Sequence, residues 1–115
     1  MPIQIYHNPR CSKSRQTLEL LEKKGLKPEV RLYLESPPSR SELGELLKKL
    51  GLKATQLIRT KEDIYRDLVK KEGAPDEATA LKWMVQHPKL MERPIVVKGN
   101  KARLGRPPEQ VLEIL

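Results

Sequence analysis

The 115-residue chain contains no phenylalanine, one tryptophan, three tyrosines and a single cysteine. With so few aromatic side chains, the core must be built from leucine, isoleucine and valine, and recognition of nucleic acid by base stacking is disfavoured. One cysteine cannot form an internal disulfide. Because the sequence also lacks Cys or His pairs at ligand spacing, we expect no structural metal and no bound cofactor.

Long apolar runs are missing too, since none approaches the roughly 20 residues needed to cross a bilayer. The first residues, Met1-Pro2-Ile3-Gln4-Ile5, lead into a strand pattern rather than into a basic segment followed by an apolar one. We therefore expect a cytoplasmic protein without membrane contact. No apolar surface stripe is left once the predicted helices are packed, so we also expect a monomer.

Positive charge is abundant and dispersed. The 23 lysines and arginines exceed the 15 acidic residues by eight, and they are spread along the chain rather than gathered in one run. A surface of this kind attracts anions of many types. Charge alone therefore does not decide between nucleic acid, an acidic protein and a small oxyanion.

Hydrophobic periodicity predicts the order strand, helix, strand, three helices, two strands and helix. This order is that of an α/β thioredoxin-like domain with a mixed sheet (β-α-β, helical insert, β-β-α). We expect one domain over residues 1–115 with the insert at about 39–87. The predicted elements are a strand around Ile3 and Ile5, a helix at 12–24, a strand at 30–34, helices at 39–50, 61–71 and 76–86, a hairpin at 94–104 and a helix from 106.

Three of these elements carry specific expectations for their apolar side. The second strand is expected to alternate Val30, Leu32 and Leu34 with Arg31 and Tyr33. The helix at 76–86 is expected to bury Leu81, Met84 and Val85. The last helix is expected to bury Val111, Leu112 and Leu115.

The lone cysteine, Cys11, lies in His7-Asn8-Pro9-Arg10-Cys11-Ser12-Lys13-Ser14-Arg15, where the first strand gives way to a helix. A helix N-terminus presents unpaired N–H groups and the positive end of the helix dipole, and three basic residues lie nearby. All of these favour thiolate over thiol. The same donors can hold an oxyanion, so the segment predicts a nucleophile beside an anion site. The alternative is an inert cysteine.

Three segments together resemble the glutaredoxin-coupled arsenate reductase family over essentially the whole chain. They are the Cys11 segment, Gln86-His87-Pro88-Lys89-Leu90-Met91-Glu92-Arg93-Pro94-Ile95-Val96-Val97, and Ala102-Arg103-Leu104-Gly105-Arg106-Pro107. The resemblance implies a thioredoxin-like fold, Cys11 as the catalytic nucleophile, and Arg59, Arg93 and Arg106 as binders of arsenate. It also implies a cis peptide bond between Arg93 and Pro94.

The activity implied by this resemblance is reduction of arsenate to arsenite by attack of the Cys11 thiolate on arsenic. Glutathione then serves as co-substrate and glutaredoxin as partner. A chain with one cysteine has no internal resolving thiol, which agrees with thiols supplied from outside.

Three further residues are expected to support the site. His7 is placed to tune the thiolate, and Ser14 and Arg15 to hold the loop. Plainer interpretations stay open at this stage: His7 as a neutral structural histidine, Ser14 as a helix cap, and the three arginines as ordinary surface charges.

Two other functions also stay open. Thioredoxin-fold regulators of the Spx type, which bind RNA polymerase, share the Arg-Pro-Ile-Val-Val segment. Their redox-sensing members carry Cys-x-x-Cys, whereas Ser14 stands at the second position here. The other alternative is a thiol oxidoreductase that acts on a different oxyanion or on a glutathione-linked substrate.

Overall fold

The computed structural model describes residues 2–115. The chain divides into two compact units, one made of Met1–Ser36 together with Arg93–Leu115 and the other of Pro37–Glu92. Across the described residues, no helix has the combined length and hydropathy required to span a lipid bilayer.

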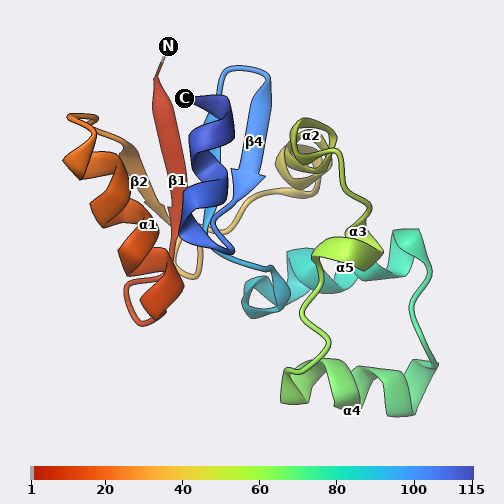
Figure 1. Ribbon diagram of the computed structural model, residues 1–115. Coiled ribbons are helices and arrows are strands. Elements are labelled where there is room, and N and C mark those ends of the chain that lie inside the picture. The colour runs from red at the N-terminus through yellow and green to blue at the C-terminus, as the bar shows by residue number, and fades with distance from the viewer. Residues whose placement is uncertain (1) are drawn as a thin grey trace. The chain divides into compact units, whose positions relative to one another are not determined.

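The first unit is a four-stranded mixed sheet with two helices (Figure 1). The strands follow the order β2-β1-β3-β4, with β1 and β2 parallel and the other pairs antiparallel. This arrangement confirms the predicted α/β mixed sheet. Its elements are β1 (Ile3–His7), α1 (Ser12–Lys23), β2 (Glu29–Leu32), β3 (Ile95–Lys98), β4 (Lys101–Leu104) and the 3₁₀ helix η2 (Pro108–Ile114).

Strand register brings three distant segments to one edge of this sheet. Tyr6, near the end of β1, pairs with Ile95 at the start of β3, and Ile95 pairs with Leu104 at the end of β4. The residues that follow β1, precede β3 and follow β4 therefore meet at the same edge. This edge carries the carboxyl end of β1, where α/β sheets commonly place their ligand sites.

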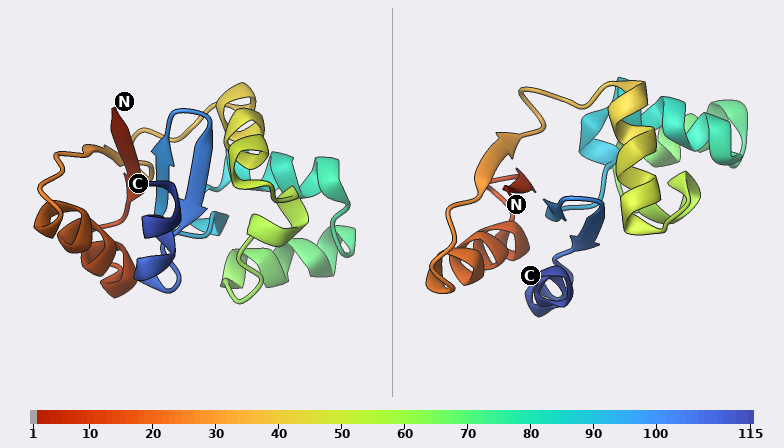
Figure 2. Two further views of the ribbon diagram at one scale, coloured as in Figure 1. Left: turned by 45° about the horizontal axis from the view of Figure 1, so that its top comes forward. Right: turned by 90° about the horizontal axis from the view of Figure 1, so that it is seen from above.

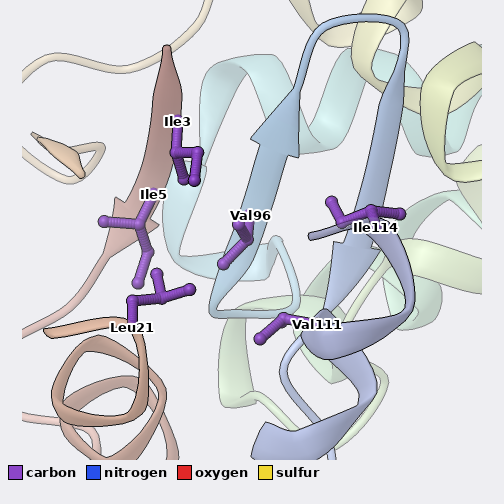
Figure 3. Packing of buried hydrophobic residues seen from close by; sticks show 6 residues of the cluster. All are labelled: Ile3, Ile5, Leu21, Val96, Val111 and Ile114. Atoms are coloured by element: carbon purple, nitrogen blue, oxygen red, sulfur yellow. The ribbon is translucent and has the colours of Figure 1, made fainter. Parts of the chain in front are cut away.

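The core of the first unit lies between the sheet and its two helices. Helices α1 and η2 cover the same face of the sheet (Figure 2). Figure 3 shows the apolar side chains that meet there. They are Ile3, Ile5, Leu21, Val96, Val111 and Ile114.

The last helix buries a different side from the expected one. Because η2 is a 3₁₀ helix with three residues per turn, Val111 and Ile114 lie on one side and are buried. Leu112 and Leu115 are 36% and 38% exposed, so the expectation that they pack inward is wrong.

The second strand is shorter than expected. β2 ends at Leu32, whose carbonyl accepts hydrogen bonds from the backbone N–H groups of Glu35 and Ser36 in a turn. Val30 and Leu34 are exposed, whereas Tyr33 is buried. The expected alternation is therefore wrong: Val30 is exposed within β2, which is the edge strand of the sheet, and beyond Leu32 the chain turns and the strand pattern ends.

The second unit is helical (Figure 1). A capping box at Ser39 and Glu42 begins its first helix, and Gly51, with φ of 70°, ends it, which agrees with the helix predicted at 39–50. Its last α-helix begins behind Asp76, which accepts a hydrogen bond from the Thr79 N–H. The elements are α2 (Arg40–Leu50), α3 (Ala54–Leu57), α4 (Asp63–Glu72), α5 (Glu77–Gln86) and the 3₁₀ helix η1 (Pro88–Leu90).

Helix α5 packs on a side that overlaps only partly with the expected one. Met84 is buried as expected, but its buried neighbours are Ala80 and Trp83, while Leu81 and Val85 are half-buried. The ring of Trp83 meets Tyr65 of α4 edge-on at a centroid distance of 5.9 Å. The one tryptophan of the chain is thus a core residue of the second unit.

Candidate functional site

Cys11 stands at the N-cap position of α1, in a loop that turns tightly after β1. The Cys11 N–H donates to the Asn8 carbonyl at 3.0 Å, and the Arg10 N–H donates to the Asn8 side-chain oxygen at 3.0 Å. The Cys11 carbonyl accepts the first helical hydrogen bond, from Arg15. The half-buried thiol is therefore held beside the unpaired amides of the first helical turn.

Arg106, which follows β4, reaches the thiol directly. Its Nη2 lies 3.6 Å from Cys11 Sγ, and its Nε donates to the Arg93 carbonyl at 2.7 Å. One guanidinium thus connects the cysteine loop to the segment that precedes β3. Cys11 and Arg106 are 95 residues apart in the sequence, and the strand register described above brings them together.

Arg93 has side-chain hydrogen-bond donors without a partner among the described residues. Within residues 2–115, its Nε and Nη1 are buried and have no hydrogen-bond partner. Buried donors without partners are rare in proteins, because the desolvated group loses its bonds to water. Two such donors on one planar guanidinium are suited to a tetrahedral oxyanion.

The electrostatic surroundings of Cys11 favour the anion. Burial raises the pKa of the thiol, but the backbone N–H groups of Ser14 and Lys13 and the charges of Arg93 and Arg106 outweigh it, so that the pKa lies below its ordinary value. These groups surround the sulfur with positive charge. The thiolate is therefore more abundant at neutral pH than that of an ordinary cysteine, and the neighbouring cations also attract anionic reactants.

His7 and Ser14 form a buried pair behind the loop. Nδ1 of His7 lies 2.6 Å from Ser14 Oγ, and this oxygen also accepts the Asn8 N–H at 3.0 Å. Burial and the charge of Arg15 hold the pKa of His7 below its usual range, so the ring is neutral at pH 7. The pair fixes the loop against the first turn of α1.

Arg15 lies on the outer side of the same turn. Its Nη1 donates to the Pro9 carbonyl at 2.8 Å, which ties the helix to the loop. The supporting residues predicted from the sequence are thus brought together with Cys11, Arg93 and Arg106 in the first unit.

Arg59 belongs to the second unit. Its Nε donates to Glu62 at 3.1 Å and its Nη1 to Glu92 at 2.8 Å, and Lys89 lies 3.7 Å from the other oxygen of Glu62. These four side chains carry two positive and two negative charges. That Arg59 helps to bind a ligand at Cys11 stays a prediction.

Two residues that the sequence reasoning did not assign lie next to the site. Gly105, which precedes Arg106 in the chain, is close to the completely buried Thr17 of α1. The peptide bond between Arg93 and Pro94 is cis, as the resemblance implies, and so is the bond between Arg106 and Pro107. Among the described residues, no group of three His, Cys, Asp or Glu side chains is arranged to hold a metal ion.

Comparison with known proteins places this geometry in a family. Residues 6–114 match the model of the ArsC family. The chain is 56% identical to the uncharacterized protein YfgD of Escherichia coli K12, over 98% of this chain and 96% of the relative. It is 49% identical to an arsenate reductase of Haemophilus influenzae over the full length of both.

A solved structure shows the same fold. The arsenate reductase from Vibrio cholerae superimposes with a TM-score of 0.93 at 51% identity, covering all of this chain and 98% of that one. The family model, the full-length relatives and the superposition agree, and the protein belongs to the ArsC family with its thioredoxin-like fold.

Proposed function

We propose that this protein reduces arsenate to arsenite, with Cys11 as the nucleophile and Arg93 and Arg106 as the oxyanion-binding groups. The observation that carries the proposal is the 3.6 Å contact between Arg106 and Cys11 Sγ, beside the buried, unpartnered donors of Arg93. The full-length similarity to arsenate reductases supports arsenate as the substrate.

The arginines suit this substrate for a physical reason. Arsenate carries one to two negative charges near neutral pH, and planar guanidinium groups make charge-assisted, often bidentate, hydrogen bonds to such oxyanions. The same cations that hold the oxyanion also hold the thiolate, so substrate and nucleophile are drawn to one place. Binding alone does not separate arsenate from phosphate, so we assign discrimination to the covalent step at sulfur.

In the first step, the Cys11 thiolate attacks arsenic, a sulfur–arsenic bond forms, and one arsenate oxygen leaves as water. Glutathione then displaces a second oxygen, also as water, which leaves arsenic bonded to both sulfurs.

The reduction follows when the thiol of glutaredoxin attacks the glutathione sulfur. The resulting disulfide joins glutaredoxin to glutathione, and the electron pair of the broken sulfur–arsenic bond reduces As(V) to As(III). Water finally releases arsenite and regenerates the Cys11 thiol. Because this chain has one cysteine, both sulfurs of that disulfide come from the external partners.

The test is arsenite formation from arsenate in the presence of glutathione, glutaredoxin and a system that regenerates glutathione. Turnover by the wild-type protein, with none from Cys11→Ser, is the expected result. Each thiol partner is then omitted in turn. Turnover that persists without glutaredoxin would contradict the proposed partner while leaving the reductase assignment in place.

The alternative function, a regulator that binds RNA polymerase, is tested in parallel with the reductase assay. Purified protein is mixed with RNA polymerase, and capture is measured under the buffer conditions of the reductase assay. Strong capture together with no arsenite would overturn the reductase proposal in favour of a regulator that binds polymerase. Arsenite formation with no capture is the outcome that we expect.

A further inference from the structure

We propose that Gly105 and Thr17 are positioning residues that set the separation between the arginines and the Cys11 thiolate. This inference deepens the proposed function and rests on it. It starts from a steric observation: Gly105 is buried, and its place in the fold leaves no room for a side chain.

A methyl group at position 105 would overlap two neighbours. A Cβ built there lies 2.7 Å from Pro94 Cγ and 3.1 Å from Thr17 Cγ2, and it also overlaps Thr17 Oγ1. Ordinary contacts begin near 3.4 Å, so Pro94 would have to move by about 0.7 Å. The glycine is required for space, since its φ lies outside the positive region that favours glycine.

Neither neighbour can move without disturbing the site. Thr17 is completely buried, and its Oγ1 donates to the Lys13 carbonyl at 2.8 Å within the first turns of α1. Lys13 supplies one of the amides that lower the pKa of Cys11. On the other side, the Gly105 N–H donates to the Pro94 carbonyl at 2.9 Å.

Position 105 therefore lies between the helix that carries the Cys11 loop and the segment that carries Arg93. It touches α1 through Thr17, and it touches the segment of Arg93 through Pro94, while Arg106 follows it directly in sequence. The contact between Arg106 Nη2 and Cys11 Sγ spans 3.6 Å, which is an ordinary length for a hydrogen bond to sulfur. A displacement of about 0.7 Å away from the thiol would lengthen it to about 4.3 Å and so break it.

The experiment measures how fast Cys11 reacts with iodoacetamide, because this rate follows the thiolate fraction and needs no arsenate turnover. The variant is Gly105→Ala. At a pH below the wild-type midpoint, we expect its rate constant to fall by about threefold or more, since a displaced cation leaves less thiolate. The KM for arsenate should rise in the same variant.

The matched control is Gly44→Ala in α2, where a new Cβ meets nothing within 4 Å. Its alkylation rate should equal that of the wild type. The double variant Thr17→Ala/Gly105→Ala removes the overlap on the α1 side, so its rate should lie between those of Gly105→Ala and the wild type.

The outcomes separate this inference from the proposed function. A rapid wild-type rate that Gly105→Ala leaves unchanged overturns the positioning role alone. A wild-type protein whose cysteine reacts like an ordinary thiol overturns the activated nucleophile itself. If Gly105→Ala does not fold, the double variant is compared with Thr17→Ala: a slower double variant supports the role, because the Pro94 overlap remains, and equal rates overturn it.

Discussion

Replacement of Arg106 by lysine keeps the positive charge and removes the planar fork, so it tests geometry rather than charge. In the structure, the Arg106 guanidinium donates to the Arg93 carbonyl at 2.7 Å while its Nη2 faces Cys11 Sγ at 3.6 Å. A lysine ammonium is a single point charge and cannot make both contacts in that arrangement. The variant therefore loses one charge-assisted hydrogen bond, worth about 1.5 to 3 kcal/mol.

If this bond is made in the transition state, kcat/KM for arsenite formation falls by roughly tenfold to a hundredfold. The matched control is Arg103→Lys in β4, three residues before Arg106. Arg103 also donates to a backbone carbonyl, that of Ala102, and pairs with Glu113, but that carboxylate is largely exposed. An exposed pair contributes about 0 to 1 kcal/mol, so this variant should stay within a few-fold of the wild type.

The steady-state assay follows arsenite at several arsenate concentrations, and circular dichroism checks that both variants are folded. Equal kcat/KM for Arg106→Lys and the wild type would refute the assignment of Arg106 to the oxyanion site. Equal losses in Arg106→Lys and Arg103→Lys would show that the hairpin as a whole, and not the guanidinium at the thiol, is required.

Arg59→Lys should lower kcat/KM less than Arg106→Lys, because two nitrogens of Arg59 already donate to Glu62 and Glu92; an equal or larger loss in the same assay would show otherwise. The free energy of unfolding should fall as the pH drops below about 6.5, since the unfolded chain binds a proton that buried, neutral His7 does not; urea titrations should show a weaker pH dependence in His7→Gln. Ser39→Ala should lower that free energy by about 1 kcal/mol through loss of the capping box, and an unchanged urea midpoint would argue against it.

Local signals account for the parts of the fold that the sequence predicts well. The capping box at Ser39, the cap at Asp76 and the Gly99-Asn100 turn each specify an element through residues close in sequence. In the first strand, Ile3 and Ile5 are both buried in the cluster beneath the helices, as their spacing of two residues predicts.

The elements that were missed depend on distant residues. Helix α3 is only four residues long, and the N–H groups of Ala54 and Thr55 at its start donate to Glu77, 22 to 23 positions further along the chain. No local pattern contains that cap. The sequence does not determine the buried side of η2, because apolar residues occur at both helical and 3₁₀ spacing, and only packing selects Val111 and Ile114.

In the candidate site too, local features can be predicted from the sequence, whereas contacts between distant residues cannot. A cysteine at a strand-to-helix boundary among basic residues is visible in the sequence, and it predicts the lowered pKa that the structure supports. The contact of Arg106 with Cys11 spans 95 residues and becomes evident only with the strand register. Gly105 carries no chemical group at all, so its role emerges only from the space around it.

The most direct test of the central claim is a pH titration of the Cys11 thiol in the unmodified protein. The ultraviolet absorbance of the thiolate is measured at each pH, and the absorbance of Cys11→Ser is subtracted from that of the wild type. We expect a midpoint below the value near 8.5 of an ordinary cysteine, because helix amides and two guanidinium groups lower the pKa of the thiol. A midpoint at or above 8.5 would contradict the activated thiolate on which the site depends.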